Sequence, residues 1–289
     1  MVIKRFLGVA AMVLSVLVLG VVSIGAQAQG AYATLPGVRL WFVDTGGTGA
    51  PVVLLHPNTG TSDIWKQQIG PLSRAGYRVI AFDRRGWGKS LADPATGDQP
   101  GSVAGDLHAL AEHLRLERFH VVGVAGGGFV ALDYAAWHPE KVIALVVGAT
   151  TGQISEREMQ EMTARIAIPG LTELPLQYRE VGASFRATNA EGLAEWIAIE
   201  ARSQQDGAPA QPLHTLNTYA KLETIRAPVL ILAGDADLVA PPGLMKVWGA
   251  HLKNGRFDFI PDAGHAMAWE RPDAFNEKVL QFLKKTPAP

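Results

Sequence analysis

The sequence of 289 residues contains no cysteine. This absence excludes disulfide bridges, a cysteine nucleophile and thiolate metal ligands. The chain also lacks an excess of one charge, because 26 basic and 27 acidic residues leave a formal net charge of −1. Nothing in this balance favours a nucleic-acid partner. The eight histidines show no His-x-x-x-His spacing supported by acidic residues, and no cofactor motif occurs, so we expect neither a metal nor a cofactor.

The first 28 residues have the pattern of an export signal. Lys4 and Arg5 precede an uncharged segment from Phe6 to Ile24, and Ala26-Gln27-Ala28 has the small-x-small form of a cleavage site. We therefore predict an exported, most simply periplasmic protein whose mature domain covers residues 29–289. The uncharged segment is nearly long enough to cross a bilayer, so an uncleaved N-terminal anchor is the alternative. Without that anchor, no stable membrane insertion is expected.

Strand-like and helix-like patterns alternate along the rest of the chain. Apolar runs predict strands at residues 38–44, 51–56, 78–82, 119–124, 142–147, 228–233 and 257–260. Periodic apolar residues predict helices at residues 65–75, 102–114, 126–138 and 272–284. Such alternation indicates a doubly wound α/β domain with a mostly parallel sheet.

The alternation stops between Thr151 and about Leu222. This stretch is longer than one crossover needs, and it contains only helix and loop patterns. We interpret it as an inserted helical cap over about residues 152–222. Its apolar side chains either line a pocket or pack the cap onto the sheet. They are Met159, Met162, Ile166, Leu171, Leu174, Tyr178, Phe185, Trp196 and Ile199.

Four short patterns occur at or after the predicted strands, and together they are more specific than any one alone. The first is His56-Pro57-Asn58-Thr59-Gly60, and the second is Asp83-Arg84-Arg85-Gly86-Trp87-Gly88-Lys89-Ser90. The third, Gly123-Val124-Ala125-Gly126-Gly127, lies between a strand and a helix. The fourth is a pair of segments, Gly234-Asp235-Ala236-Asp237 and Ala263-Gly264-His265.

Together these patterns resemble the α/β-hydrolase superfamily, from about Arg39 to Leu283. The second pattern matches the family's Asp-x-Arg-Gly-x-Gly-x-Ser loop, whose role is mainly structural. The third has the position and the small flanking residues of the Gly-x-Ser-x-Gly nucleophile elbow. The resemblance implies the α/β-hydrolase fold, with a mostly parallel eight-stranded sheet.

The resemblance also implies the roles of four residues. Asp237 matches the acid and His265 the base of the family, with Asp235 the less favoured acid. The acid would hold the histidine tautomer, and the histidine would transfer the proton. The N–H groups of Asn58 and Gly126 match the oxyanion hole.

This sequence departs from the family at two positions. Pro57 replaces the usual glycine of the oxyanion loop, which can change the geometry of that loop. Ala125 stands where the nucleophile is expected, and a methyl group cannot attack a carbonyl. Ser62, Thr59 and Thr61 lie near the oxyanion loop, but we interpret them as turn or helix-cap residues rather than replacement nucleophiles.

Three interpretations of Ala125 remain open. In the first, the chain is an enzyme without a serine nucleophile, in which the His265–Asp237 dyad acts as a general base in ester or C–C hydrolysis or in a cofactor-free lyase reaction. In the second, it is a serine ester hydrolase inactivated by a Ser-to-Ala change, which the retained leader disfavours. In the third, it is a non-catalytic small-molecule binding or sensor protein. An apolar pocket under a cap predicts that the binding partner is a small, largely hydrophobic carbonyl or ester compound. The sequence does not predict the oligomeric state.

Overall fold

The computed structural model describes residues 28–286, so the predicted leader lies outside the described residues except for Ala28. The strands form one sheet in the order β1-β2-β4-β3-β6-β7-β8-β9. Their bounds are β1 Gln29–Leu35, β2 Val38–Asp44, β3 Pro51–Leu55, β4 Arg78–Phe82, β6 Phe119–Val124, β7 Val142–Gly148, β8 Val229–Gly234 and β9 Gly255–Ile260. A two-residue strand, β5 (Leu91–Ala92), pairs with β2. All pairs from β4 to β9 are parallel, which confirms the predicted mostly parallel sheet.

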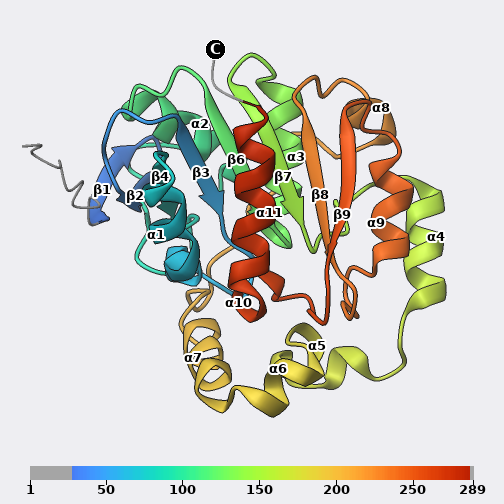
Figure 1. Cartoon of the computed structure of the whole chain (residues 1–289). Helices are drawn as coiled ribbons and strands as arrows, with labels where there is room; N and C mark the ends of the chain where they lie inside the picture. Colours follow the sequence, from blue (N-terminus) through green and yellow to red (C-terminus); the bar gives the residue numbers. More distant parts are fainter. Residues whose placement is uncertain (1–27, 287–289) are drawn as a thin grey trace, which may run out of the picture.

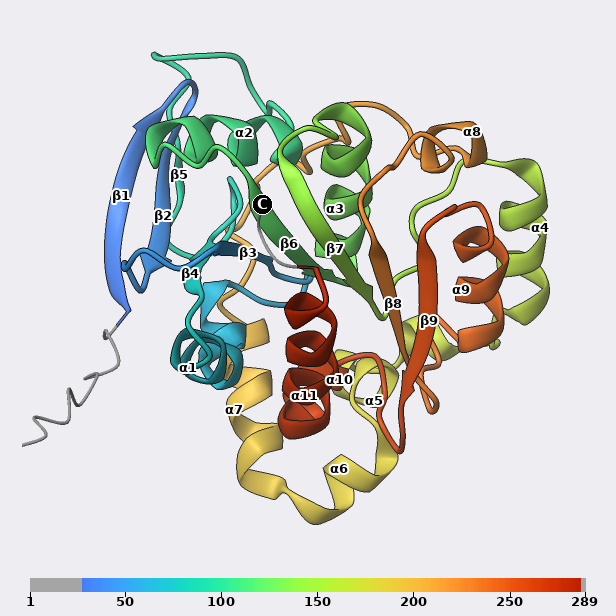
Figure 2. The ribbon, with the colours of Figure 1, turned by 45° about the horizontal axis from the view of Figure 1, so that its top comes forward.

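Helices cover both faces of this sheet (Figures 1 and 2). Side chains of β3 alternate between the two apolar cores, with Val53 and Leu55 on one face and Val52 and Leu54 on the other. This alternation explains why the central strands read as continuous apolar runs, since both of their faces are buried. On the first face lie α2 (Val103–His113), α3 (Gly126–Trp137) and α9 (Pro242–Gly249); on the second lie α1 (Lys66–Arg74) and α11 (Pro272–Lys284).

Some helix starts follow local sequence signals. The Ser102 hydroxyl accepts a hydrogen bond from Gly105 N–H at 3.1 Å and begins α2, as expected of an N-cap serine. Pro272 occupies the first turn of α11, where its missing N–H has no cost. The helix predicted from residue 65 begins earlier, as a 3-10 turn from Ser62 to Trp65 that precedes α1.

The segment between β7 and β8 contains no strand, but its helices do not all cover the same surface. α4 (Arg157–Ile166) packs beside α9, and α8 (Tyr219–Leu222) packs on α3. In contrast, α5 (Leu176–Glu180), α6 (Ala183–Thr188) and α7 (Ala190–Glu200) lie across the carboxyl ends of the parallel strands (Figure 1). Part of the segment therefore extends the side of the molecule, and α5–α7 face the edge where the loop patterns meet.

Three further elements complete the fold. A short 3-10 helix (Leu171–Glu173) precedes α5, and α10 (Met267–Glu270) precedes α11. β1 was not predicted from the sequence; it pairs with β2 along its whole length. Within residues 28–286, no helix is both long and apolar enough to cross a membrane.

Candidate active site

Ala125 occupies the turn between β6 and α3, in a conformation that is unusual for a residue with a Cβ. Its φ is 48° and its ψ is −117°. The turn is held by its own backbone: Ala125 N–H donates to Gly148 O at 2.9 Å, and Ala125 O accepts from Gly128 N–H at 3.0 Å. The Thr150 hydroxyl also donates to Ala125 O, at 2.9 Å. The turn therefore has the sharp geometry expected of a nucleophile elbow, with a methyl group at its central position.

Close backbone contacts require the small residues around Ala125. A Cβ on Gly127 would overlap the carbonyl of Leu55 in β3, and a Cβ on Gly123 would overlap the carbonyl of Gly127. These contacts are between backbone groups, which cannot rotate away. The glycines at these two positions let β6, α3 and β3 approach at the elbow.

The structure brings Asp237 and His265 together, from the loops after β8 and β9. His265 Nδ1 lies 2.9 Å and 3.1 Å from the two carboxylate oxygens of Asp237. Both residues are buried. Asp237 Oδ1 also accepts the N–H groups of Val239 and Ala240, at 2.8 Å and 2.9 Å. These bonds fix the carboxylate, so Nδ1 of His265 carries the hydrogen and Nε2 is left as the basic nitrogen.

Charge pairing outweighs burial in this dyad. Burial alone would raise the pKa of Asp237, but the neighbouring His265 and the two N–H donors hold that pKa below its ordinary value. Burial alone would lower the pKa of His265, but Asp237, followed by Glu180 and Glu270, raises it above 6.5. The arrangement stabilises the imidazolium that forms when His265 accepts a proton.

Asp235 lies elsewhere. It is exposed, and its Oδ1 accepts the N–H of Asp262 at 2.6 Å. This bond ties the loop after β8 to the loop after β9. Asp235 thus positions the loops, while Asp237 contacts the histidine.

The oxyanion loop lies against the elbow. Asn58 covers Gly126, since a Cβ on that glycine would overlap the Asn58 side chain. Asn58 Oδ1 accepts from Arg84 Nη2 at 2.9 Å, and Asn58 O accepts from Trp87 Nε1 at 2.8 Å. Within residues 28–286, the backbone N–H groups of Asn58 and Gly126 meet no protein acceptor, so both remain available as donors.

His56 anchors this loop as a neutral residue. Its Nε2 accepts from Arg84 N–H at 3.0 Å, so its Nδ1 carries the hydrogen that lies 2.7 Å from Pro57 O. Burial, with the charge of Arg84 added, lowers the pKa of His56 well below 6.5. His56 therefore holds the loop in place and does not act as a base.

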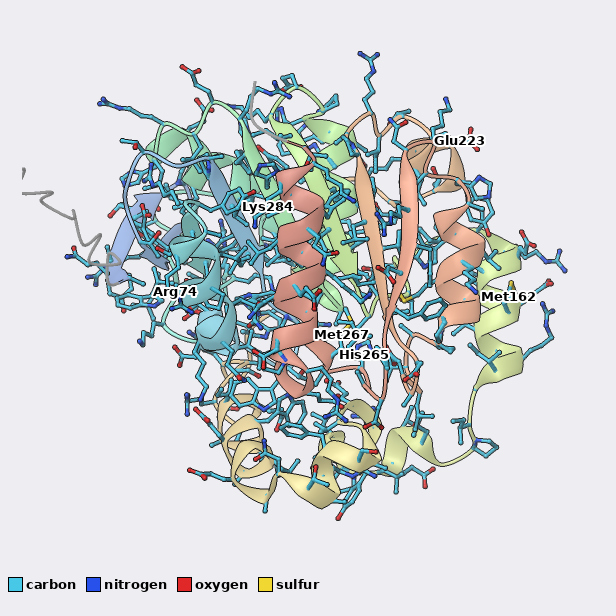
Figure 3. All side chains as sticks on the ribbon, viewed as in Figure 1. Arg74, Met162, Glu223, His265, Met267 and Lys284 are labelled. Carbon is cyan, nitrogen blue, oxygen red and sulfur yellow. The ribbon has the colours of Figure 1, made fainter. Side chains whose placement is uncertain are left out.

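A small cavity of about 20 Å³ lies beside His265, under helices α5–α7. Figure 3 shows His265 at the edge of the sheet that faces these helices. The volume is roughly what one water molecule occupies. Its lining residues are Pro57, Thr59, Ile64, Val124, Glu180, Trp196, His265, Ala266, Ala268 and Trp269.

Besides His265, two polar residues line this cavity: Glu180, which was not named from the sequence, and Thr59, which was interpreted as a turn or helix-cap residue. The Thr59 hydroxyl donates to Glu180 Oε2 at 2.7 Å. Glu180 also accepts Ala266 N–H through its backbone oxygen at 2.9 Å, which places the end of α5 next to His265. No sequence motif surrounds Glu180. Its position next to His265 becomes visible only in the structure, because it depends on how α5 packs over the sheet.

The other residues near the oxyanion loop are structural, in agreement with their interpretation as turn and cap residues. The Thr61 hydroxyl caps the 3-10 turn by accepting Asp63 N–H at 3.2 Å. Ser62 is buried, and its N–H donates to Asp83 at 2.7 Å. Of the apolar residues named between 152 and 222, only Trp196 lines the cavity beside His265. Ile166, Leu174 and Tyr178 are exposed.

Comparison with known sequences identifies the protein family. Residues 52–278 match the alpha/beta hydrolase family. The chain belongs to this family. BpoC of Mycobacterium tuberculosis, named as a candidate non-heme bromoperoxidase, is 31% identical over 263 residues, with 85% of this chain and 98% of BpoC covered. A 2-hydroxy-6-oxononadienedioate/2-hydroxy-6-oxononatrienedioate hydrolase of Paraburkholderia phymatum is 30% identical, with 85% and 91% covered.

Solved structures of alpha/beta hydrolases superpose on most of the chain. A thermophilic esterase of Thermogutta terrifontis gives a TM-score of 0.72 at 26% identity, with 90% of this chain and all of the esterase covered. The family and the predicted fold are thus confirmed. The α/β-hydrolase scaffold places the elbow, the dyad and the oxyanion loop at one edge of the sheet.

Proposed function

We propose that the protein is a serine-free hydrolase of a small, largely hydrophobic ester or related carbonyl compound. His265 acts as the general base, Asp237 holds it, and the N–H groups of Asn58 and Gly126 stabilise the oxyanion. The buried pair between His265 Nδ1 and Asp237 carries this proposal. A site that had lost catalysis would have no need to keep a buried, oriented acid–base pair next to a strained elbow.

In the first step, a water molecule in the cavity beside His265 gives a proton to Nε2. The resulting hydroxide attacks the carbonyl carbon, and the carbonyl oxygen becomes an oxyanion that accepts the N–H groups of Asn58 and Gly126. The positive charge on His265 faces Asp237 at 2.9 Å. No acyl-enzyme forms, because Ala125 has no nucleophilic atom.

In the second step, the tetrahedral intermediate collapses. The carbonyl bond re-forms, the bond to the leaving alcohol breaks, and His265 Nε2–H protonates that alcohol. One ester and one water give one acid and one alcohol, and His265 returns to its neutral form. The hydrolase and esterase names of the relatives support this reaction class.

Ala125→Ser tests whether the remaining machinery is competent. If the dyad and the oxyanion loop are built for catalysis, this variant gains a burst of hydrolysis on short-chain p-nitrophenyl esters and an acyl adduct visible by intact-protein mass spectrometry. Ala125→Ser/His265→Ala is the matched control and should lose the burst. Ligand-dependent melting without turnover in either form would instead favour a binding protein.

We further propose that the chain is exported and that α5–α7, the part of the predicted 152–222 cap that lies over the site, cover its active site. The first strand begins at Gln29, directly after the proposed cleavage site, which supports a mature domain from that residue. Expression of the full chain in a Gram-negative host, followed by cell fractionation and N-terminal sequencing, should give periplasmic protein beginning at Gln29. Membrane-bound protein that keeps its first residues would show an anchor instead.

A further inference from the structure

A second cavity lies on the other side of the oxyanion loop, and its volume is about 220 Å³. It is bounded by the loops after β3 and β4, by α2 and α3, and by the segment that follows α7. Its lining residues are Asn58, Arg84, Trp87, Val103, Gly126, Phe129, Val130, Gln153, Ala210, Gln211, Pro212 and Leu213. Seven of these twelve residues are apolar, whereas Asn58, Arg84, Gln153 and Gln211 bring polar groups to the cavity. The volume is somewhat below that of pockets for drug-sized ligands, ~300–1000 Å³.

Arg84 supplies a buried cation to this cavity. Only 5% of the residue is exposed, yet within residues 28–286 its guanidinium pairs with no carboxylate. Buried charges in proteins are normally paired, because an isolated one is costly. The neighbouring Arg85 shows the usual solution, since it forms a buried pair with Asp106 at 2.6 Å.

The guanidinium of Arg84 is held in place but not satisfied. Nη2 donates to Asn58 Oδ1 at 2.9 Å, and the guanidinium carbon lies 4.8 Å from the ring centre of Trp87. Nε is buried without an acceptor. A guanidinium carries five N–H groups in a rigid fork, so most of its donors remain open. Burial lowers the pKa of Arg84 to about 9, which still leaves it charged at neutral pH.

Another lining residue, Gln211, offers an acceptor. Gln211 Nε2 donates to Pro100 O at 3.1 Å and to Asp106 Oδ2 at 2.8 Å, which fixes the orientation of the amide. Its Oε1 is buried and has no donor. The cavity thus combines an open cation, an open acceptor and apolar walls formed by Phe129, Val130 and Leu213.

We propose that this cavity binds a small organic carboxylate, whose carboxylate group pairs with Arg84 and whose body lies against the apolar walls. A carboxylate matches the fork of the guanidinium and neutralises its charge. The site is adjacent to Asn58 and Gly126, so its ligand lies beside the oxyanion loop. Binding does not depend on the proposed hydrolysis and is measured without turnover.

The test uses the mature chain and three probes: 4-methylpentanoate, its neutral isostere 4-methylpentanamide, and 2-hydroxy-4-methylpentanoate. Isothermal titration calorimetry should show saturable binding of 4-methylpentanoate at millimolar or lower concentration, and about tenfold or more weaker binding of the amide. The hydroxy acid should bind at least as tightly as the parent acid, since its hydroxyl can donate to Gln211 Oε1.

Arg84→Met should abolish carboxylate binding and leave the weak amide binding unchanged. Arg74→Met, which removes an exposed arginine on α1 (labelled in Figure 3), is the matched control and should change neither. Leu213→Trp fills the cavity from its half-buried rim and should block both ligands, so it decides the matter if Arg84→Met fails to fold. Equal binding of acid and amide, unchanged binding in Arg84→Met or Leu213→Trp, or no binding of any probe at millimolar concentration would overturn the proposal.

Discussion

Ala125 adopts φ 48° and ψ −117°, a conformation that costs a residue with a Cβ about 1–3 kcal/mol. Three hydrogen bonds, to Gly148, Gly128 and Thr150, hold it there. Such strain persists only where the surroundings determine the backbone, and it is concentrated at functional sites. The strained backbone at Ala125 therefore marks this turn as part of a functional site.

The raised pKa of His265 predicts a defined pH dependence. His265 must be neutral to accept a proton, so kcat/KM should fall as the pH drops through its raised pKa. The acidic limb of the pH profile is therefore expected above 6.5. A profile that is flat from pH 6 to pH 9 would contradict this expectation.

Asp237→Asn tests the contribution of the His265–Asp237 pair to the pH profile and to the rate. Without the carboxylate, only the charges of Glu180 and Glu270 oppose the lowering of the His265 pKa by burial, and the acidic limb should move to lower pH. The rate should fall by a factor of about 10² or more, because an asparagine amide can hold the wrong tautomer of the histidine. Asp235→Asn is the control, because Asp235 is exposed and does not contact His265.

At the scale of elements, the site depends on how closely α3 approaches β3. Gly127→Ala would place a Cβ against the carbonyl of Leu55. Because neither backbone can yield cheaply, we expect a loss of more than about 2 kcal/mol in the free energy of unfolding, measured by urea denaturation.

Gly243→Ala is the matched control for this substitution. Gly243 lies in α9, and a Cβ there would meet nothing within 4 Å. Its replacement should leave stability unchanged or raise it by up to about 1 kcal/mol. Similar losses in both variants would mean that close packing at the elbow is not the cause.

The sequence predicted the central strands because they are buried on both faces, which produces apolar runs such as Val52 to Leu55. It predicted α2 from the apolar periodicity of residues 102–114, and Ser102 caps this helix in the structure. It did not predict β1, whose first four residues are exposed, nor the split of the 152–222 segment into α4 beside α9 and α5–α7 over the site. Both depend on long-range packing that no local pattern encodes.

The same distinction applies to the site. Asp237 and His265 follow strand ends with recognisable glycines, so the sequence could propose the pair. Glu180 was missed because its position depends on where α5 lies relative to the sheet. Arg84 lies within a motif interpreted as structural, and only the cavity shows that its charge has no carboxylate partner.

For the whole molecule, Glu270 links the segment above the site to the sheet. Its Oε2 accepts Gly182 N–H, at the start of α6, and Gly264 N–H, next to His265, both at 3.0 Å. Burial, opposed only in part by these donors, raises the pKa of Glu270 to about 7. The folded protein therefore favours the protonated carboxyl.

This raised pKa makes stability depend on pH. Protonated Glu270 contributes to the free energy of unfolding. This contribution is complete below the unfolded pKa of 4.5 and is lost as the pH rises towards 7. Glu270→Gln keeps an acceptor without the charge, so it should remove this loss. Thermal unfolding measures this effect. Compared with the native chain, Glu270→Gln should raise the free energy of unfolding by up to about 3 kcal/mol at pH 8 and by little at pH 5. A gain that does not change with pH would argue against this role.

The most direct test of the account is the hydrolysis of short-chain p-nitrophenyl esters by the mature native chain and by His265→Ala. If His265 is the general base of a serine-free hydrolase, the native chain turns over the ester without forming an acyl adduct, and His265→Ala lowers kcat/KM by a factor of about 10² or more. Equal rates in the two proteins, or no turnover by the native chain above the uncatalysed reaction, would contradict it.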